Sequence, residues 1–117
     1  MNQLPSPIDF SDLLEMLGGD KQIVASLLSK FVDELTTDLA ASELSITDQD
    51  AEALRQIAHR IKGTSANLHA LMLSAAAREL EQACTEADAS LMKIKQRVMS
   101  DQARTVREAI ESWGAEN

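Results

Sequence analysis

The chain has 117 residues, a net charge of −8, 44% hydrophobic and 3% aromatic residues, and a single cysteine, Cys84. This length predicts one domain that buries about two-thirds of its unfolded surface, and the scarcity of aromatic residues favours packed helices over a sheet. The acidic charge argues against a nucleic-acid partner, whose phosphates are bound by Lys and Arg, and one cysteine excludes an internal disulfide and a thiolate-rich metal site.

The first predicted element is a flexible lead-in over residues 1–8, which contains both prolines, Pro5 and Pro7. It lacks the charged-then-apolar pattern of a signal peptide. Nowhere does an apolar run approach the roughly 20 residues that cross a bilayer. We therefore expect a cytoplasmic protein without membrane contact, whose single domain spans residues 9–117.

Two helices are predicted next. Asp9 can cap a short helix over residues 10–17, which the following glycine pair ends. Asp20 begins a second helix that lasts to about residue 42. Its apolar residues recur at spacings of three and four, as on the buried face of a helix: Ile23, Val24, Leu27, Leu28, Phe31, Leu35 and Leu39.

The third predicted helix, residues 49–68, contains the motif on which the functional interpretation rests. Thr47 followed by Asp50 is a weak capping signal for its start, because the usual partner is Glu or Gln. A tight corner is expected at His69-Ala70, after its end.

Two more helices complete the prediction. The fourth, residues 71–86, has an inward face that includes small side chains, which let helices approach closely: Leu73, Ala76, Ala77, Leu80 and Cys84. The last begins at Asp88 or Ser90, and its polar centre, residues 100–104, indicates a tail that extends past the core or curves. Its apolar residues are Leu91, Ile94, Val98, Val106, Ala109, Ile110 and Trp113. Four long helices joined by short turns predict an all-α fold, an antiparallel up-down four-helix bundle with a short additional N-terminal helix.

His59 lies on the exposed side of the third helix. With about 100° between successive side chains, it points about 170° away from the apolar cluster that includes Leu54 and Ile61. Its neighbours on the helical wheel are Arg55, Lys62, Gly63 and Ala66. Glycine inside a helix costs roughly 1 kcal/mol relative to alanine, and close approach of a partner to the imidazole is a reason to have it there.

The segment from His59 to Ala70, HRIKGTSANLHA, resembles the signature of histidine-containing phosphotransfer (HPt) domains of bacterial phosphorelays. That signature is a histidine, two residues, Lys-Gly and several small residues, ending in Gly-Ala. The chain follows it through Asn67 and has His69 where the family usually has glycine. The resemblance implies that His59 accepts a phosphoryl group from the aspartyl phosphate of a receiver domain and passes it to another receiver aspartate.

The resemblance also implies how the neighbours of His59 act. Lys62 is expected to stabilise the charge of the phosphoryl group, and Gly63 to give the receiver steric access to the imidazole. Arg55 either assists or only offsets nearby acidic side chains. The receiver supplies an acidic cluster and Mg²⁺, so no cofactor and no metal is expected on this chain. Nothing in the sequence resembles an ATP site, which predicts a phosphotransfer intermediate without autokinase activity.

The expected partners are receiver domains of response regulators, and the chain itself is expected to be a monomer. A hybrid sensor kinase stays open as a further partner, as does the choice between a free-standing protein and a domain of such a kinase. From a different functional class, the alternative is a helical adaptor that binds protein partners without chemistry. A histidine-kinase dimerisation domain fits less well, because this chain has enough helices to close a bundle alone.

Other residues have simpler interpretations. Thr64 and Ser65 turn toward the core and are expected to pack there, and Cys84 is expected to pack as a small hydrophobe. His69 and His59 together are too sparse a ligand set for a metal site. The charged residues of the fourth helix, Arg78, Glu79 and Glu81, are interpreted as solvated helix surface.

Overall fold

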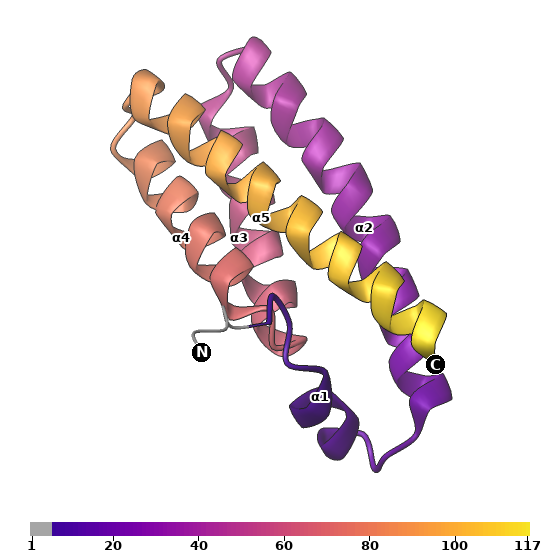
Figure 1. Ribbon diagram of the computed structural model, residues 1–117. Helices are drawn as coiled ribbons and strands as arrows, with labels where there is room; N and C mark the ends of the chain where they lie inside the picture. Colours follow the sequence, from indigo (N-terminus) through magenta and orange to yellow (C-terminus); the bar gives the residue numbers. More distant parts are fainter. Residues whose placement is uncertain (1–5) are drawn as a thin grey trace, which may run out of the picture.

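The computed structural model describes residues 6–117, and this part of the chain forms five α-helices (Figure 1). They are α1 (Phe10–Met16), α2 (Lys21–Thr47), α3 (Ala51–Asn67), α4 (Leu71–Thr85) and α5 (Ala89–Glu116). Helices α2 to α5 run alternately up and down, and each contacts two others in a closed ring, α2–α3–α4–α5. The predicted all-α bundle with a short N-terminal helix is confirmed.

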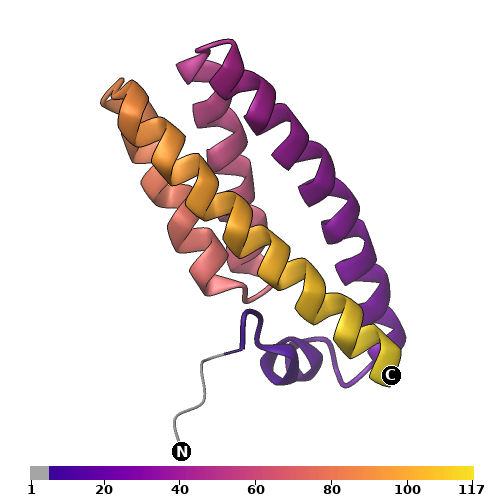
Figure 2. The same cartoon turned by 45° about the horizontal axis from the view of Figure 1, so that its top comes forward.

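The four bundle helices differ in length, which leaves one end of the bundle to be covered. α2 and α5 have 27 and 28 residues, whereas α3 and α4 have 17 and 15. At 1.5 Å per residue, the long pair extends about 40 Å and the short pair about 25 Å. The start of α2 and the end of α5 therefore run past the α3–α4 hairpin, and α1 lies across this end (Figure 2).

The segment around α1 is anchored by buried and stacked side chains. The ring of Phe10 stacks on that of Trp113 near the end of α5, with centroids 5.4 Å apart and planes 3° from parallel. The backbone N–H of Asp9 donates to the carbonyl of His69, at the α3–α4 corner, over 3.2 Å. Ile8 is fully buried, although it lies in the predicted flexible lead-in of residues 1–8. Residues 1–5 of that lead-in lie outside the described residues.

The predicted helix starts at Asp9, Asp20 and Asp88 are confirmed, since each side chain accepts hydrogen bonds from backbone N–H groups of the first turn. The predicted end of α2 near residue 42 is wrong, because the helix continues to Thr47. As a consequence the capping signal at Thr47 is wrong too. Asp50 caps α3 instead and accepts from the N–H of Ala53.

The three turns between the bundle helices share one geometry. In each, a backbone N–H bonds to the carbonyl five residues earlier, in Asp50 to Ser45, Ala70 to Ser65 and Asp88 to Ala83. The residue before each donor has a positive φ: Gln49 at 56°, His69 at 61° and Ala87 at 55°. Glycine usually marks this C-terminal cap, and its absence from all three turns explains why the end of α2 was misplaced.

The predicted inward face of α4 is confirmed, with all five residues buried, and burial raises the pKa of the Cys84 thiol to about 11. The exposed positions of Ile23 and Leu27 on α2 contradict their predicted burial, and Ile94 and Val98, among the apolar residues of α5, are exposed as well. The buried face of α5 is instead formed by Met92, Met99, Ala103, Val106 and Ile110. This stripe includes Ala103, in the polar centre of the helix, so α5 packs against the core there and does not leave it.

Over residues 6–117, no helix combines the length and apolar character needed to span a membrane.

Truncation of Ile8 tests the ordered start of the chain. Ile8→Ala should lower the free energy of unfolding by about 2–5 kcal/mol, because it removes a fully buried aliphatic side chain and leaves a cavity. The matched control is Ile94→Ala, at a position that is 59% exposed, where the change should stay within about 0.5 kcal/mol. Urea unfolding followed by circular dichroism compares the two. Equally small effects would place residue 8 in a loose lead-in.

Candidate functional site

His59 lies on the outer face of α3, as its position on the helical wheel predicted. Its side chain is 64% exposed, while Leu54, Ile57 and Ile61 on the opposite face are buried. These apolar contacts fix how α3 is rotated about its axis. The imidazole therefore projects from a helix whose orientation the core determines, rather than from a loop.

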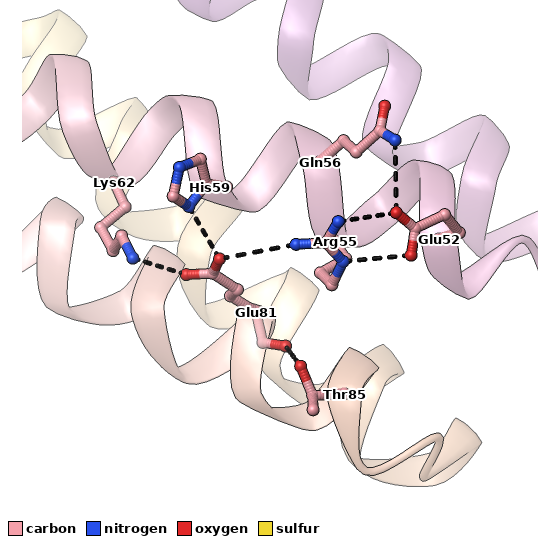
Figure 3. A network of polar contacts seen from close by, with 7 residues as sticks. All are labelled: Glu52, Arg55, Gln56, His59, Lys62, Glu81 and Thr85. Atoms are coloured by element: carbon pink, nitrogen blue, oxygen red, sulfur yellow. Dashed lines mark hydrogen bonds and ion pairs between the residues drawn. The ribbon is translucent and has the colours of Figure 1, made fainter.

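The carboxylate of Glu81, on α4, connects the polar side chains around His59 (Figure 3). One oxygen, Oε2, lies 2.8 Å from Nδ1 of His59, and the other, Oε1, accepts from Nζ of Lys62 at 2.7 Å. A second cation is near, since Nη1 of Arg55 lies 4.0 Å from Oε2. The Glu81 side chain is only 17% exposed. The Lys62 ammonium lowers the pKa of Glu81 most, the bond to His59 lowers it further, and burial opposes both.

The contact with Glu81 determines which nitrogen of a neutral His59 carries the proton. An ionised carboxylate can only accept hydrogen bonds, so Nδ1 is the protonated nitrogen. Nε2 then keeps its lone pair, and it lies on the side of the ring away from Glu81 (Figure 3). Nε2 is thus a nucleophilic nitrogen that faces solvent, and the bond from Nδ1 to Glu81 fixes the orientation of the ring.

Lys62 and Arg55 are held in different ways. Lys62 has one carboxylate partner, Glu81, and its side chain is 32% exposed. Arg55 makes two hydrogen bonds to Glu52, at 2.7 and 3.1 Å, and Gln56 donates to the same carboxylate. These bonds raise the pKa of Arg55 and lower that of Glu52. Arg55 is thus a guanidinium fixed by Glu52 at the edge of the site.

Gly63 lies in an open part of the surface, one turn after His59. A Cβ atom added there would have no neighbour within 4 Å. Close packing against another helix therefore does not explain the glycine, which leaves the access explanation standing. Ser65 is buried as expected, whereas Thr64 is half-buried and lines a surface hollow; both hydroxyls donate to backbone carbonyls of α3.

Two contacts tie the back of this site to the neighbouring helices. Arg60 bonds to Asp38 of α2 at 2.7 Å, and the hydroxyl of Ser74 on α4 donates to the carbonyl of Lys62 at 2.9 Å. His69 is not brought to His59. Its Nδ1 lies 2.8 Å from Oδ2 of Asp12, and residues 6–117 contain no cluster of three or more potential metal ligands.

A family model for the Hpt domain matches residues 26–115. The chain belongs to the Hpt domain family. Hpt domains are histidine phosphotransfer intermediates of phosphorelays that interact with response-regulator receiver domains, and they are not kinases. The predicted family and its role are confirmed.

The fold is similar to the crystal structure of the histidine-containing phosphotransfer protein B (HptB) from Pseudomonas aeruginosa PAO1. The TM-score is 0.87 and the sequence identity 23%, and the match covers 98% of this chain and 99% of the other. Because it extends over both chains, the short N-terminal helix belongs to the shared fold. A search of curated proteins finds no match.

Glu81 is the site residue that the sequence interpretation missed. Its assignment to solvated helix surface is wrong, because three side chains of α3 surround its carboxylate. The expected antiparallel pairing of α3 and α4 could have identified Glu81. In an antiparallel pair with its corner at His69, residues about equally far before and after the corner lie side by side, and His59 and Glu81 meet this condition.

Substitution of Gly63 tests whether its surroundings are open. Gly63→Ala should raise the free energy of unfolding by up to about 1 kcal/mol, because alanine favours the helix and meets no neighbour. Gly63→Gln should be at least as stable as wild type for the same reason. Thermal melts of the three proteins measure this. A destabilised glutamine variant would show that the position is closed in solution.

Proposed function

We propose that His59 of this Hpt domain is the phosphoacceptor and that Nε2 is the reacting atom. The observation that carries the proposal is the bond from Nδ1 to Glu81 on an otherwise exposed imidazole. This bond directs the lone pair of Nε2 outward, to where a receiver can bring its aspartyl phosphate. The bundle contributes mainly orientation, the principal requirement of phosphoryl transfer.

In the transfer step the Nε2 lone pair forms a bond to phosphorus while the bond from phosphorus to the aspartate oxygen breaks. The electron pair of that bond leaves with the aspartate, which becomes a carboxylate on the receiver. The imidazole ring gains positive charge, and the Glu81 carboxylate at Nδ1–H stabilises it. Transfer to a second receiver reverses these changes, with another aspartate as the attacking group.

The neighbouring residues take the roles that the motif implied. Lys62 stabilises phosphoryl charge as a flexible point charge, and Gly63 leaves room for the receiver. The receiver contributes Mg²⁺ and its acidic residues, so this chain binds no cofactor and has no ATP site or autokinase activity. Receivers dock in turn on one monomeric domain, over the outer faces of α3 and α4.

Exposed apolar side chains next to this face extend the proposed docking surface. Met16, Ile23 and Leu27 are exposed, and Met16 and Leu27 line a hollow of about 340 Å³ at the end of α3, together with Lys30 and Glu34 of α2. Thr64 and Asn67 line it from α3. Apolar area farther along α3 from His59 can hold a receiver in position.

Removal of the imidazole tests the phosphoacceptor. His59→Gln should abolish labelling by a ³²P-phosphorylated receiver domain and leave stability within about 0.5 kcal/mol of wild type, since the side chain is exposed. His69→Gln is the control and should be labelled like wild type. The label should be acid-labile and base-stable, as expected of a phosphohistidine. Labelling of His59→Gln would refute the assignment, and an unlabelled wild type would favour the adaptor alternative.

A larger side chain at position 63 tests whether Gly63 gives the receiver access to His59. Gly63→Gln should fold normally but accept phosphate from the receiver at least about tenfold more slowly, because its side chain lies one turn from the imidazole and obstructs a macromolecular donor. A small donor, phosphoramidate, should phosphorylate Gly63→Gln and wild type at similar rates. Full activity of the variant with the receiver would rule out the access role.

A further inference from the structure

The charges around His59 are balanced before any phosphoryl group arrives. Two cations, Arg55 and Lys62, face two carboxylates, Glu52 and Glu81, and each cation already lies within ion-pair distance of a carboxylate. A phosphoryl group adds a charge of about −1.5 to −2 at neutral pH. The site therefore meets this charge with cations that are already paired, so the phosphoryl group competes with Glu52 and Glu81 for them.

Lys62 is the cation that the geometry allows to move. It is bound by one carboxylate through a single ammonium, at the end of a flexible four-carbon chain. Arg55 is held by a two-bond contact with Glu52 and by the planar shape of its guanidinium. Lys62 also follows His59 by three residues on α3, so both side chains project from the same helix face.

We propose that Glu81 is a positioning residue that holds Lys62 beside His59 and competes with the phosphoryl group for it. This inference rests on His59 being the phosphoacceptor. In the free protein the Lys62 ammonium lies on Oε1 of Glu81. Once Nε2 carries the phosphoryl group, the ammonium moves to the phosphoryl oxygens, while Oε2 keeps its bond to Nδ1–H. Arg55, 4.0 Å away, then provides the remaining positive charge near Glu81.

The competition sets how long phospho-His59 lasts. Hydrolysis passes through a loose, metaphosphate-like transition state, in which the phosphoryl oxygens carry less charge than in phosphohistidine. An ammonium on these oxygens therefore stabilises the phosphorylated state more than the transition state and slows the loss of phosphate. Because Glu81 draws Lys62 back, its carboxylate shortens the lifetime of the phosphorylated protein and makes the group easier to pass on.

A double-mutant cycle on the whole chain tests this competition. Wild type, Glu81→Gln, Lys62→Ala and the double variant are phosphorylated with phosphoramidate, the donor is removed, and the decay of phosphohistidine is followed by ³¹P NMR. Glu81→Gln should lengthen the lifetime about two- to fivefold, the range expected for one partly exposed ion pair. In the Lys62→Ala background the same substitution should not lengthen the lifetime and should shorten it, because only the contact of the carboxylate with the charged ring is then lost.

Glu79→Gln is the matched control. Glu79 lies on the same helix and binds a lysine, Lys95, at the same 2.7 Å, but it does not contact His59. Its substitution should leave the lifetime unchanged. In wild type, phosphorylation should also shift the ¹⁵N signal of the Lys62 ammonium and leave that of Lys95 in place, which a purely structural role of Glu81 does not predict.

The outcomes separate the two proposals. If wild type takes no phosphate, or takes it on a residue other than His59, the proposed function fails. If His59 is phosphorylated but Glu81→Gln lengthens the lifetime equally with and without Lys62, the carboxylate acts through its charge alone and the exchange is refuted. An unchanged or shorter lifetime in Glu81→Gln, or a Lys62 signal that does not move, refutes it as well.

Discussion

The hydrogen bond between His59 and Glu81 is the constraint on which the proposed chemistry of this domain depends. An exposed imidazole on an isolated helix turns freely and exchanges its proton between two nitrogens. Here a largely covered carboxylate 2.8 Å from Nδ1 selects one tautomer and one ring orientation. The bond crosses from α4 to α3, so the reactivity of one helix is determined by its neighbour. The close pairing of these two helices is therefore a functional requirement as well as a structural one.

That pairing depends on the corner between the helices. His69 adopts a φ of 61°, a conformation that favours glycine, at the position where the family signature usually has one. The chain holds this residue in place from both sides: its carbonyl accepts from the N–H of Asp9, and its imidazole contacts Asp12. The N-terminal segment thus contacts the corner between the two helices through the Asp9 backbone and the Asp12 side chain.

A feature could be predicted from the sequence when its pattern lies within one helix, and not when it depends on how two helices face each other. The outward position of His59 and the buried face of α4 are properties of single helices, and helical periodicity revealed both. The role of Glu81 depends on how two helices face each other, which no single-helix pattern contains. On α5, Ile94 and Val98 form an apolar pair off the stripe that packs, so the list of apolar residues alone did not define the buried face. The end of α2 was misplaced because Gln49 occupies a left-handed turn position without being glycine.

A relay intermediate must hold a phosphoryl group long enough to meet a partner and weakly enough to release it. A free cation beside Nε2 would stabilise the phosphorylated state by the whole of a new ion pair. A cation taken from Glu81 contributes only the difference between two ion pairs, each worth about 0.2–1 kcal/mol at a partly exposed site. Since about 1.4 kcal/mol changes an equilibrium tenfold, this difference shifts the equilibrium between free and phosphorylated His59 by less than about tenfold. In the proposed mechanism, Glu81 thus prepares His59 to accept the group and limits how firmly the site retains it.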